Sequence, residues 1–142
     1  MVSELEAAEF EVGQFRISWS GAKAGQVVVV PLEKPEHIIW RSVPRTSFLT
    51  AGIGDAKVSE SRGFFRISEK LHSCARAQVV ESLEPGDGFL KLSGRFADKR
   101  KSEWTVRFSC VDDRQLALDA SASIEGRPCN RLCIVAGSSA EE

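Results

Sequence analysis

The sequence predicts an all-β protein, an antiparallel β-sandwich of about ten or eleven short strands in one domain that covers residues 1–142. In several segments the apolar residues recur at every second position, which is the spacing of a strand with one buried face. Turns rich in glycine, proline and aspartate separate these segments at intervals of roughly 8–12 residues, as in sandwiches and barrels. No longer stretch has the 3.6-residue period of a helix.

The strands can be placed from this alternation. Phe15, Ile17 and Trp19 alternate with polar residues and predict a strand with one wet face, whereas four consecutive valines predict that 26–31 is buried on both faces. The acidic start is too short for a stable helix, and we expect residues 1–9 to be a loose lead-in. The expected strands cover residues 15–19, 26–31, 37–42, 48–53, 56–60, 74–82, 89–93, 104–109, 116–122 and 130–136.

A further strand is predicted in the stretch 60–71, which holds the only adjacent phenylalanines. Phe65 and Ile67 lie two positions apart, which predicts a half-buried strand, and we expect both side chains in the core. Gly63 interrupts the strand pattern and predicts a bulge or a close backbone approach. We expect Gly63 to be required for its backbone geometry.

The composition excludes several classes of protein. The formal net charge is −1, so no nucleic-acid or acidic-membrane partner is indicated. The longest aliphatic run, residues 27–30, is far shorter than the roughly 20 residues that span a bilayer. The N-terminus is acidic where a secretory signal would be basic and then apolar, so a cytoplasmic location is expected.

No metal site or cofactor is predicted. Among the four cysteines, Cys74, Cys110, Cys129 and Cys133, only the last two are close in sequence, whereas a structural zinc site has two close pairs. Positions four apart in a strand lie roughly 13 Å from each other, too far to share an ion. We therefore expect buried, reduced thiols that act as small apolar side chains.

The sequence contains no recognisable catalytic motif. His37 and His72 have no neighbouring ligand, and no phosphate-binding loop or nucleophile elbow is present. The adjacent Asp112 and Asp113 are better explained by a turn than by a pair of glycosidase carboxylates, which must face each other across a substrate. The three tryptophans, Trp19, Trp40 and Trp104, could stack on sugars if exposed, but their apolar strands favour core packing.

The order of several blocks resembles the N-terminal domain of family 31 glycoside hydrolases, most closely the sulfoquinovosidase-like α-glucosidases of bacteria and their plant relatives. The blocks are Ile39-Trp40-Arg41-Ser42, Phe48-Leu49, Gly52-Ile53-Gly54-Asp55-Ala56, Arg62-Gly63-Phe64-Phe65-Arg66-Ile67 and Lys70-Leu71. The resemblance continues through Leu116-Ala117-Leu118 to Asn130-Arg131-Leu132 and ends at 138–142, where the family enters its Tyr-Gly-x-Gly-Glu segment. The Arg-Gly-x-Phe block is the most specific of these.

The resemblance implies a β-sandwich of the galactose-mutarotase-like type that packs on a catalytic (β/α)8 barrel and lends a loop to the rim of its pocket. The family's two catalytic aspartates lie on that barrel, so no catalytic residue is expected here. Residues 137–142 would lead toward the barrel, which is the expected partner, with carbohydrate as a further possibility.

Two loops, 43–47 and 52–55, are candidates for contact with the barrel or the substrate. Arg45 and Asp55 are the candidate rim residues within them. Arg62 is expected to form a buried structural ion pair, with Asp55, Glu60 or Glu69 as its partner.

Three alternatives stay open. A carbohydrate-binding module would expose two or more tryptophans on one sheet face. A lipid-carrier barrel has a similar length and strand number, but it needs a helical pair after the first strand, where residues 20–25 form a tight glycine turn. The third is a pure interaction or structural sandwich. An isolated N-terminal domain, in contrast, should expose the apolar patch that normally meets the barrel, so self-association in sedimentation would favour the N-terminal domain over this third alternative.

Overall fold

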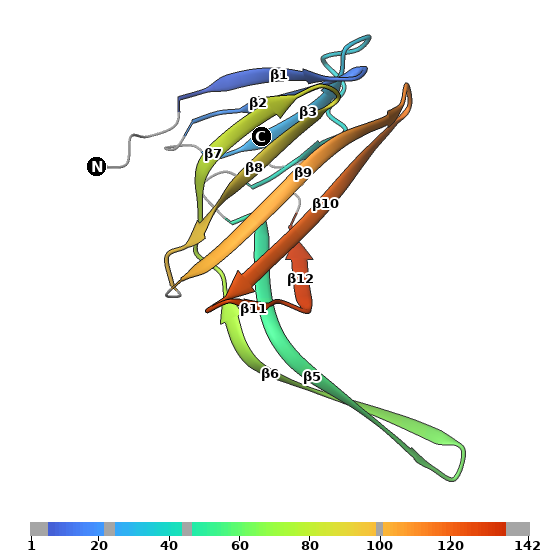
Figure 1. The fold of residues 1–142 in the computed structure, drawn as a ribbon. Helices are drawn as coiled ribbons and strands as arrows, with labels where there is room; N and C mark the ends of the chain where they lie inside the picture. The colour runs from blue at the N-terminus through green and yellow to red at the C-terminus, as the bar shows by residue number, and fades with distance from the viewer. Residues whose placement is uncertain (1–5, 22–24, 44–46, 99–100, 136–142) are drawn as a thin grey trace.

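The computed structural model describes residues 6–21, 25–43, 47–98 and 101–135. These residues form twelve antiparallel strands in three sheets and contain no helix, which confirms the predicted all-β sandwich (Figure 1). It follows that no helix in the described part of the chain is long and apolar enough to cross a membrane.

The first sheet has the strand order β1-β2-β3-β4. Its strands are β1 (Ala8–Val12), β2 (Phe15–Trp19), β3 (Val27–Pro31) and β4 (Trp40–Arg41). The predicted alternation in β2 is confirmed, because Phe15, Ile17 and Trp19 are all buried. The expectation of a loose lead-in is wrong for its last two residues. Ala8 and Glu9 belong to β1, which pairs with β2 over its whole length and so satisfies its backbone groups on that edge.

The second sheet is a meander with the order β11-β10-β9-β8-β7. Its strands are β7 (Gln78–Gly86), β8 (Phe89–Phe96), β9 (Ser102–Asp112), β10 (Gln115–Ile124) and β11 (Arg127–Pro128). The Asp112–Asp113 pair lies where β9 turns into β10, and the backbone N–H of Arg114 donates to Oδ1 of Asp112 at 2.7 Å. This local bond confirms that the aspartates serve a turn.

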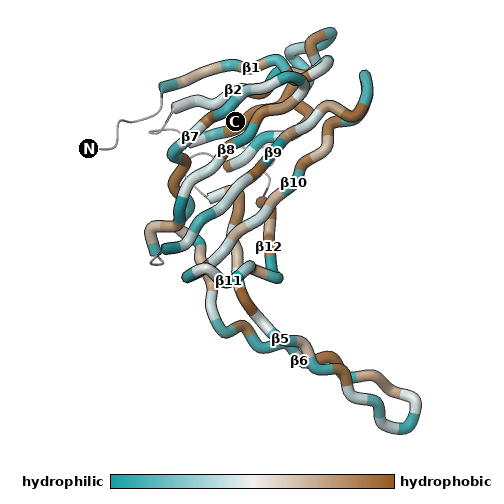
Figure 2. The backbone as a smooth tube through the Cα atoms, viewed as in Figure 1, coloured by the Kyte–Doolittle hydropathy of each residue, from teal (hydrophilic) through white to brown (hydrophobic). Residues whose placement is uncertain are grey.

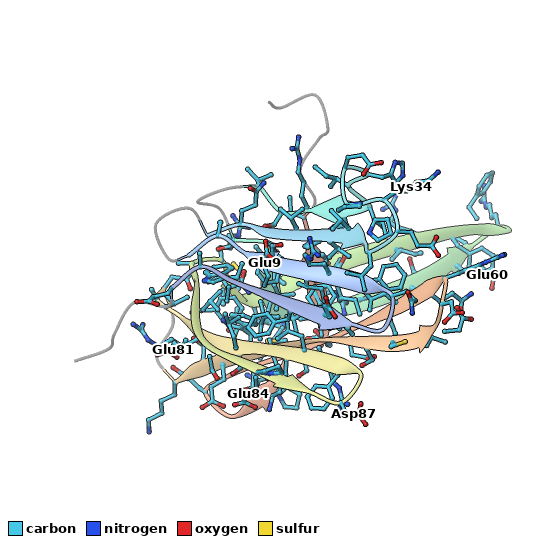
Figure 3. The ribbon with its side chains drawn as sticks, turned by 90° about the horizontal axis from the view of Figure 1, so that it is seen from above. Glu9, Lys34, Glu60, Glu81, Glu84 and Asp87 are labelled. Atoms are coloured by element: carbon cyan, nitrogen blue, oxygen red, sulfur yellow. The ribbon has the colours of Figure 1, made fainter. Side chains whose placement is uncertain are left out.

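The core lies between these two sheets, which form the two layers seen from above in Figure 3. Aromatic rings dominate its centre. The rings of Phe48 and Trp104 meet edge to face with centroids 5.8 Å apart, and the Trp40 ring contacts both Phe48 and Phe108 at 6.2 Å. The fully buried side chains include Val12, Ile17, Val27, Phe48, Leu49, Leu90, Leu92, Phe96, Trp104, Val106 and Phe108.

The third sheet has the order β12-β5-β6 and is built from β5 (Leu49–Ser61), β6 (Phe64–Ala75) and β12 (Arg131–Ile134). Only its root belongs to the core, through residues such as Leu49, Ala51 and Ile53. Beyond this root, β5 and β6 leave the sandwich together as a two-stranded hairpin (Figure 1). Residues 55–71 of this hairpin are called the arm below. The predicted loop at 52–55 is wrong, because β5 is continuous through it.

The turn of the arm consists of Arg62 and Gly63, whose φ angles are 52° and 83°. Positive φ at both central positions is the requirement of a type I′ hairpin turn, whose twist matches the strands on either side. The positive φ of Gly63 favours glycine at this position, and it occurs in a turn and not in the predicted bulge.

The bulge lies at His72 instead. Ile53 pairs with Ser73, whereas the next residue, Gly54, pairs with Leu71, so that His72 is an extra residue on β6. An extra residue on one strand bends the ladder and increases its twist. The bend occurs where the strands leave the sandwich.

Candidate functional site

The arm has one predominantly apolar face. Directly paired residues in an antiparallel ladder point to the same side of the sheet, so the pairs Val58–Ile67 and Glu60–Phe65 share a face. Ala56 and Glu69 extend the same face toward the root. Three of its side chains, Phe65, Ile67 and Val58, are 71%, 70% and 65% exposed. Figure 2 shows that hydrophobic and hydrophilic residues alternate along the two strands of the hairpin.

The expectation that Phe65 and Ile67 lie in the core is therefore wrong. The alternation of apolar and polar residues correctly predicts that one face of the strand is apolar. The sandwich, however, is already filled at the root by Ile53 and Ala75, and no described element covers the arm beyond them. The apolar face of the arm is exposed.

The opposite face of the arm is polar and mostly basic. It carries Lys57, Arg66 and Lys70, together with Asp55, which pairs with Lys70 across the ladder. Phe64 lies on this face next to the turn and is highly exposed. The two faces would thus contact quite different surfaces.

The backbone edges of the arm are also open. Strand β12 pairs with β5 only from Leu49 to Gly52, and β6 is the outermost strand of its sheet. Within the described residues, the N–H and C=O groups that point outward from the arm have no strand partner. A two-stranded hairpin is marginally stable alone, and an open edge is a template for pairing with another chain. The arm therefore has the features of a docking element.

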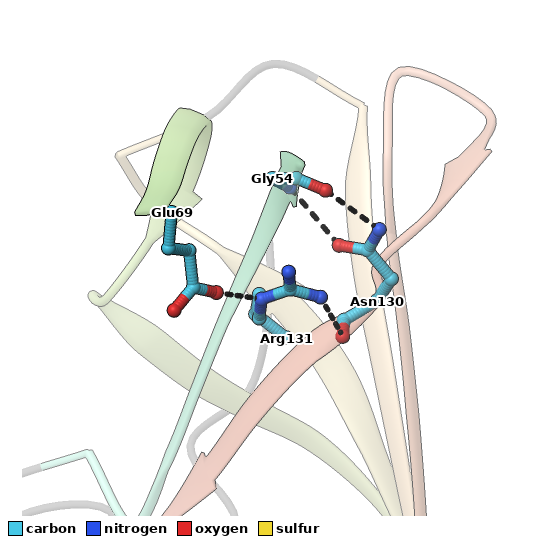
Figure 4. A network of polar contacts seen from close by, with 4 residues as sticks. All are labelled: Gly54, Glu69, Asn130 and Arg131. Atoms are coloured by element: carbon cyan, nitrogen blue, oxygen red, sulfur yellow. Dashed lines mark hydrogen bonds and ion pairs between the residues drawn. The ribbon is translucent and has the colours of Figure 1, made fainter. Parts of the chain in front are cut away.

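Polar contacts fix the arm at its root (Figure 4). The backbone N–H of Gly54 donates to Oδ1 of Asn130 at 3.0 Å, and Nδ2 of Asn130 donates to the carbonyl of Gly54 at 2.8 Å. The amide of Asn130 thus replaces a strand partner just where β12 is absent. Arg131 forms an ion pair with Glu69 and donates from Nη1 to the carbonyl of Asn130 at 3.0 Å.

A glycine permits close packing at the same place. A Cβ atom at Gly52 would lie 2.8 Å from Cδ1 of Leu71 and 2.9 Å from the carbonyl oxygen of Ser73. Glycine thus lets Leu71 lie against the backbone of β5. The apolar face of the arm continues through Leu71 onto the outer face of the third sheet.

Asp55, one of the two candidate rim residues, lies at the root of the arm. A hydrogen bond of 2.6 Å joins its Oδ2 to Nε2 of His72, the bulge residue. This hydrogen bond is the main reason why the pKa of Asp55 is lower than its ordinary value, and the nearby charges of His72, Arg131 and Arg127 act in the same direction. Arg45, the other candidate, lies outside the described residues.

Arg62 does not form the expected buried ion pair. It occupies the exposed tip of the arm, and none of the described residues pairs with it. Two of its three expected partners are engaged elsewhere, Asp55 with His72 and Glu69 with Arg131. The turn geometry separates Arg62 from both of them.

The cysteines are free thiols, but they are less buried than expected. Cys74, Cys110 and Cys129 are half-buried, and Cys133 is exposed on β12. Burial raises the pKa of the Cys129 thiol, which keeps it protonated. The described residues contain no group of three or more His, Cys, Asp or Glu side chains that could hold a metal ion.

The tryptophans do not form a platform for sugars. Trp19 and Trp104 are only 5% and 1% exposed, and Trp40 is half-buried against the core. Nε1 of Trp104 donates to the carbonyls of Val79 and Arg95, both at 3.1 Å. The preference for core packing is confirmed for Trp19 and Trp104, so the chain does not expose two tryptophans on one sheet face.

The arm and its anchors were only partly predictable. Gly63 between two alternating segments is compatible with a hairpin turn, but Arg-Gly is not among the dipeptides that strongly predict one. The contact between Asn130 and Gly54 joins residues 76 positions apart, and no pattern in the neighbouring sequence indicates it.

No protein-family model, curated protein or solved structure matches this chain.

Proposed function

We propose that this chain is the N-terminal β-sandwich domain of a family 31 α-glycosidase, of the galactose-mutarotase-like type. In this proposal the domain packs on the catalytic (β/α)8 barrel, shapes the rim of its pocket and contributes no catalytic residue. One observation carries the proposal. The block that most specifically resembles the family, residues 62–67, forms the exposed turn of the arm and contributes Phe65 and Ile67 to its apolar face.

Exposed apolar groups of this size favour a docking role. Burial of a Phe or Ile side chain contributes about 1.5–3 kcal/mol, so Phe65 and Ile67 together would contribute roughly 3–6 kcal/mol to an interface. Such an energy suits a contact between domains, where a covalent link raises the effective concentration of the partner. Asn130 and Arg131 hold the arm at its root, which lowers the entropy lost on docking.

The proposal can be tested with a barrel supplied separately. The purified chain is mixed with the catalytic barrel of a sulfoquinovosidase-like family 31 enzyme, prepared without its own N-terminal domain, and binding is measured by calorimetry. We expect the double variant F65S/I67S to bind at least about 100-fold more weakly, because it loses the apolar contribution above. Lys57→Ser, on the opposite face of the arm, is the matched control and should bind within two-fold of the wild type.

Two results would contradict the proposal. Failure of the wild-type chain to bind the barrel would reject the family assignment, and equal binding by F65S/I67S would reject the arm as the contact. Hydrolysis of a p-nitrophenyl α-glycoside by the purified chain alone, above the buffer rate, would show that the chain has an active site of its own.

The alternatives are less well supported. The described strands form three separate sheets and not one closed barrel, which disfavours a lipid-carrier barrel with its large enclosed cavity. A carbohydrate-binding module would need exposed tryptophans, and Trp19 and Trp104 are buried. An interaction sandwich of another kind would use the same arm, and the barrel experiment separates it from the family 31 proposal.

A further inference from the structure

A groove of about 610 Å³ lies at one open side of the sandwich, far in sequence from the arm. It separates β4 at the edge of the first sheet from β10 in the second sheet. Its lining comes from β2, β3, β4 and the hairpin formed by β9 and β10, and it includes no residue of β5 or β6. The groove is therefore independent of the arm.

The groove exists because the two layers differ in extent. Strand β4 contains only two residues, whereas β10 runs for ten. Leu116 and Leu118 lie opposite Cys110 and Phe108 in the ladder, and the burial of Phe108 identifies this as the inner face of the sheet. Leu118 is nevertheless 37% exposed, because the first sheet does not reach over it.

The lining is apolar with one cationic group. Trp40 and Phe108, with ring centroids 6.2 Å apart, line the groove beside Val29 and Leu116. Among the described residues, the only polar side chains in the lining are Arg114 and Gln115, which are adjacent in the chain. Ligand sites of this kind have volumes of roughly 300–1,000 Å³, apolar walls and a few polar groups that orient the ligand.

We propose that this groove binds an amphipathic carboxylate, with its hydrocarbon chain along Trp40, Phe108 and Leu118 and its carboxylate at Arg114. A guanidinium can bind both carboxylate oxygens, and no other described residue of the lining is charged. A sugar would leave most of its hydroxyl groups without partners on these walls, which is costly. Asp112 and Asp113 share the turn with Arg114 but do not line the groove.

The test compares octanoate with octanol, two ligands that have the same chain length and differ in charge. Amide chemical shifts are followed by NMR during titration of each ligand into the full chain below its micelle concentration. We expect both ligands to shift the amides of residues 108–118 and the indole N–H of Trp40. Arg114→Gln should weaken octanoate binding about two- to five-fold, the range for an exposed ion pair, and leave octanol binding unchanged.

Val111→Asp serves as a second variant, because Val111 lines the groove and is exposed, so that the fold tolerates the change. It should weaken both ligands and octanoate more strongly. The proposal is overturned if neither ligand shifts the groove amides, or if the shifts lie in the arm. It is also overturned if Arg114→Gln affects octanol and octanoate equally. None of these results depends on binding to a catalytic barrel.

Discussion

Replacing Asn130 with alanine should loosen the arm at its root. The side chain makes two hydrogen bonds to Gly54, at 3.0 and 2.8 Å, and each is worth about 0.5–1.5 kcal/mol in net terms. The pair could thus contribute about 1–3 kcal/mol. Because Asn130 lies near solvent, which partly compensates broken bonds, we expect a loss of about 1–2 kcal/mol in the free energy of unfolding.

Two measurements check this expectation. Urea denaturation gives the free energy of unfolding by linear extrapolation, and amide hydrogen exchange reports directly on the N–H of Gly54, which donates to Asn130. We expect this amide to exchange faster in Asn130→Ala, together with its neighbours in the arm, while the amides of β9 change only in proportion to the global stability.

Asn130→Asp is the matched variant. A carboxylate still accepts from the N–H of Gly54, but it cannot donate to the Gly54 carbonyl and places a negative oxygen against it. Asn130→Asp should therefore keep part of the protection at Gly54 while it loses stability. If Asn130→Ala leaves both the unfolding free energy and the exchange of Gly54 unchanged, the amide does not hold the arm and the reasoning fails.

Three further predictions concern the core, the turn and the bulge. Ile17→Ala should lower the free energy of unfolding, measured by chemical denaturation, by about 2–5 kcal/mol because Ile17 is buried. Ile67→Ala should change it by no more than about 0.5 kcal/mol because Ile67 is exposed, and equal losses would refute that assignment. Gly63→Val should destabilise the turn by roughly 1–2 kcal/mol because φ is positive, seen as faster amide exchange in the arm, and unchanged exchange would refute it. His72→Gln should raise the pKa of Asp55 toward its ordinary 3.8 in an NMR titration of the carboxyl group.

The lowered pKa of Asp55 makes its contribution to stability depend on pH. The folded-state pKa of Asp55 is lowered, so its contribution to stability is complete above the ordinary value of 3.8. The contribution is lost as the pH falls through the lower, folded-state pKa. The contact between Asp55 and His72 should thus stabilise the root of the arm above pH 3.8 and weaken as the pH falls below this value. A carboxyl pKa that does not respond to His72→Gln would contradict this.

The sequence predicts which side chains face the core of the sandwich better than it predicts which apolar side chains are exposed. Alternation identifies the inner faces of β2 and β9 correctly, as the burial of Ile17 and Phe108 shows. The same alternation at Phe65 and Ile67 marks a face that nothing described covers. A period of two distinguishes the faces of a strand but does not indicate what lies against each face.

The contacts that hold the arm at its root cannot be predicted from neighbouring residues in the sequence, for a different reason. Asn130 and Arg131 contact residues 62 to 76 positions earlier in the chain, and these contacts depend on where β12 returns to the third sheet. The order of strands in a sheet is a global property of the chain. The groove near Arg114 is likewise set by the difference in length between β4 and β10, which neither segment reveals alone.

Because of the extra residue at His72, the direction in which the arm leaves the sandwich can change without a change in the side chains on its two faces. Residues 55–71 alternate regularly on both sides of the turn, so the sequence of the arm alone determines which side chains lie on each face. The direction in which the arm leaves the sandwich depends on the single unmatched residue at its root. Removal of His72 would place Leu71 and Ser73 in regular succession opposite Gly54 and Ile53, with the same side chains on each face. A change at this one residue could therefore direct the arm toward a partner in a different position, with the same side chains available for contact.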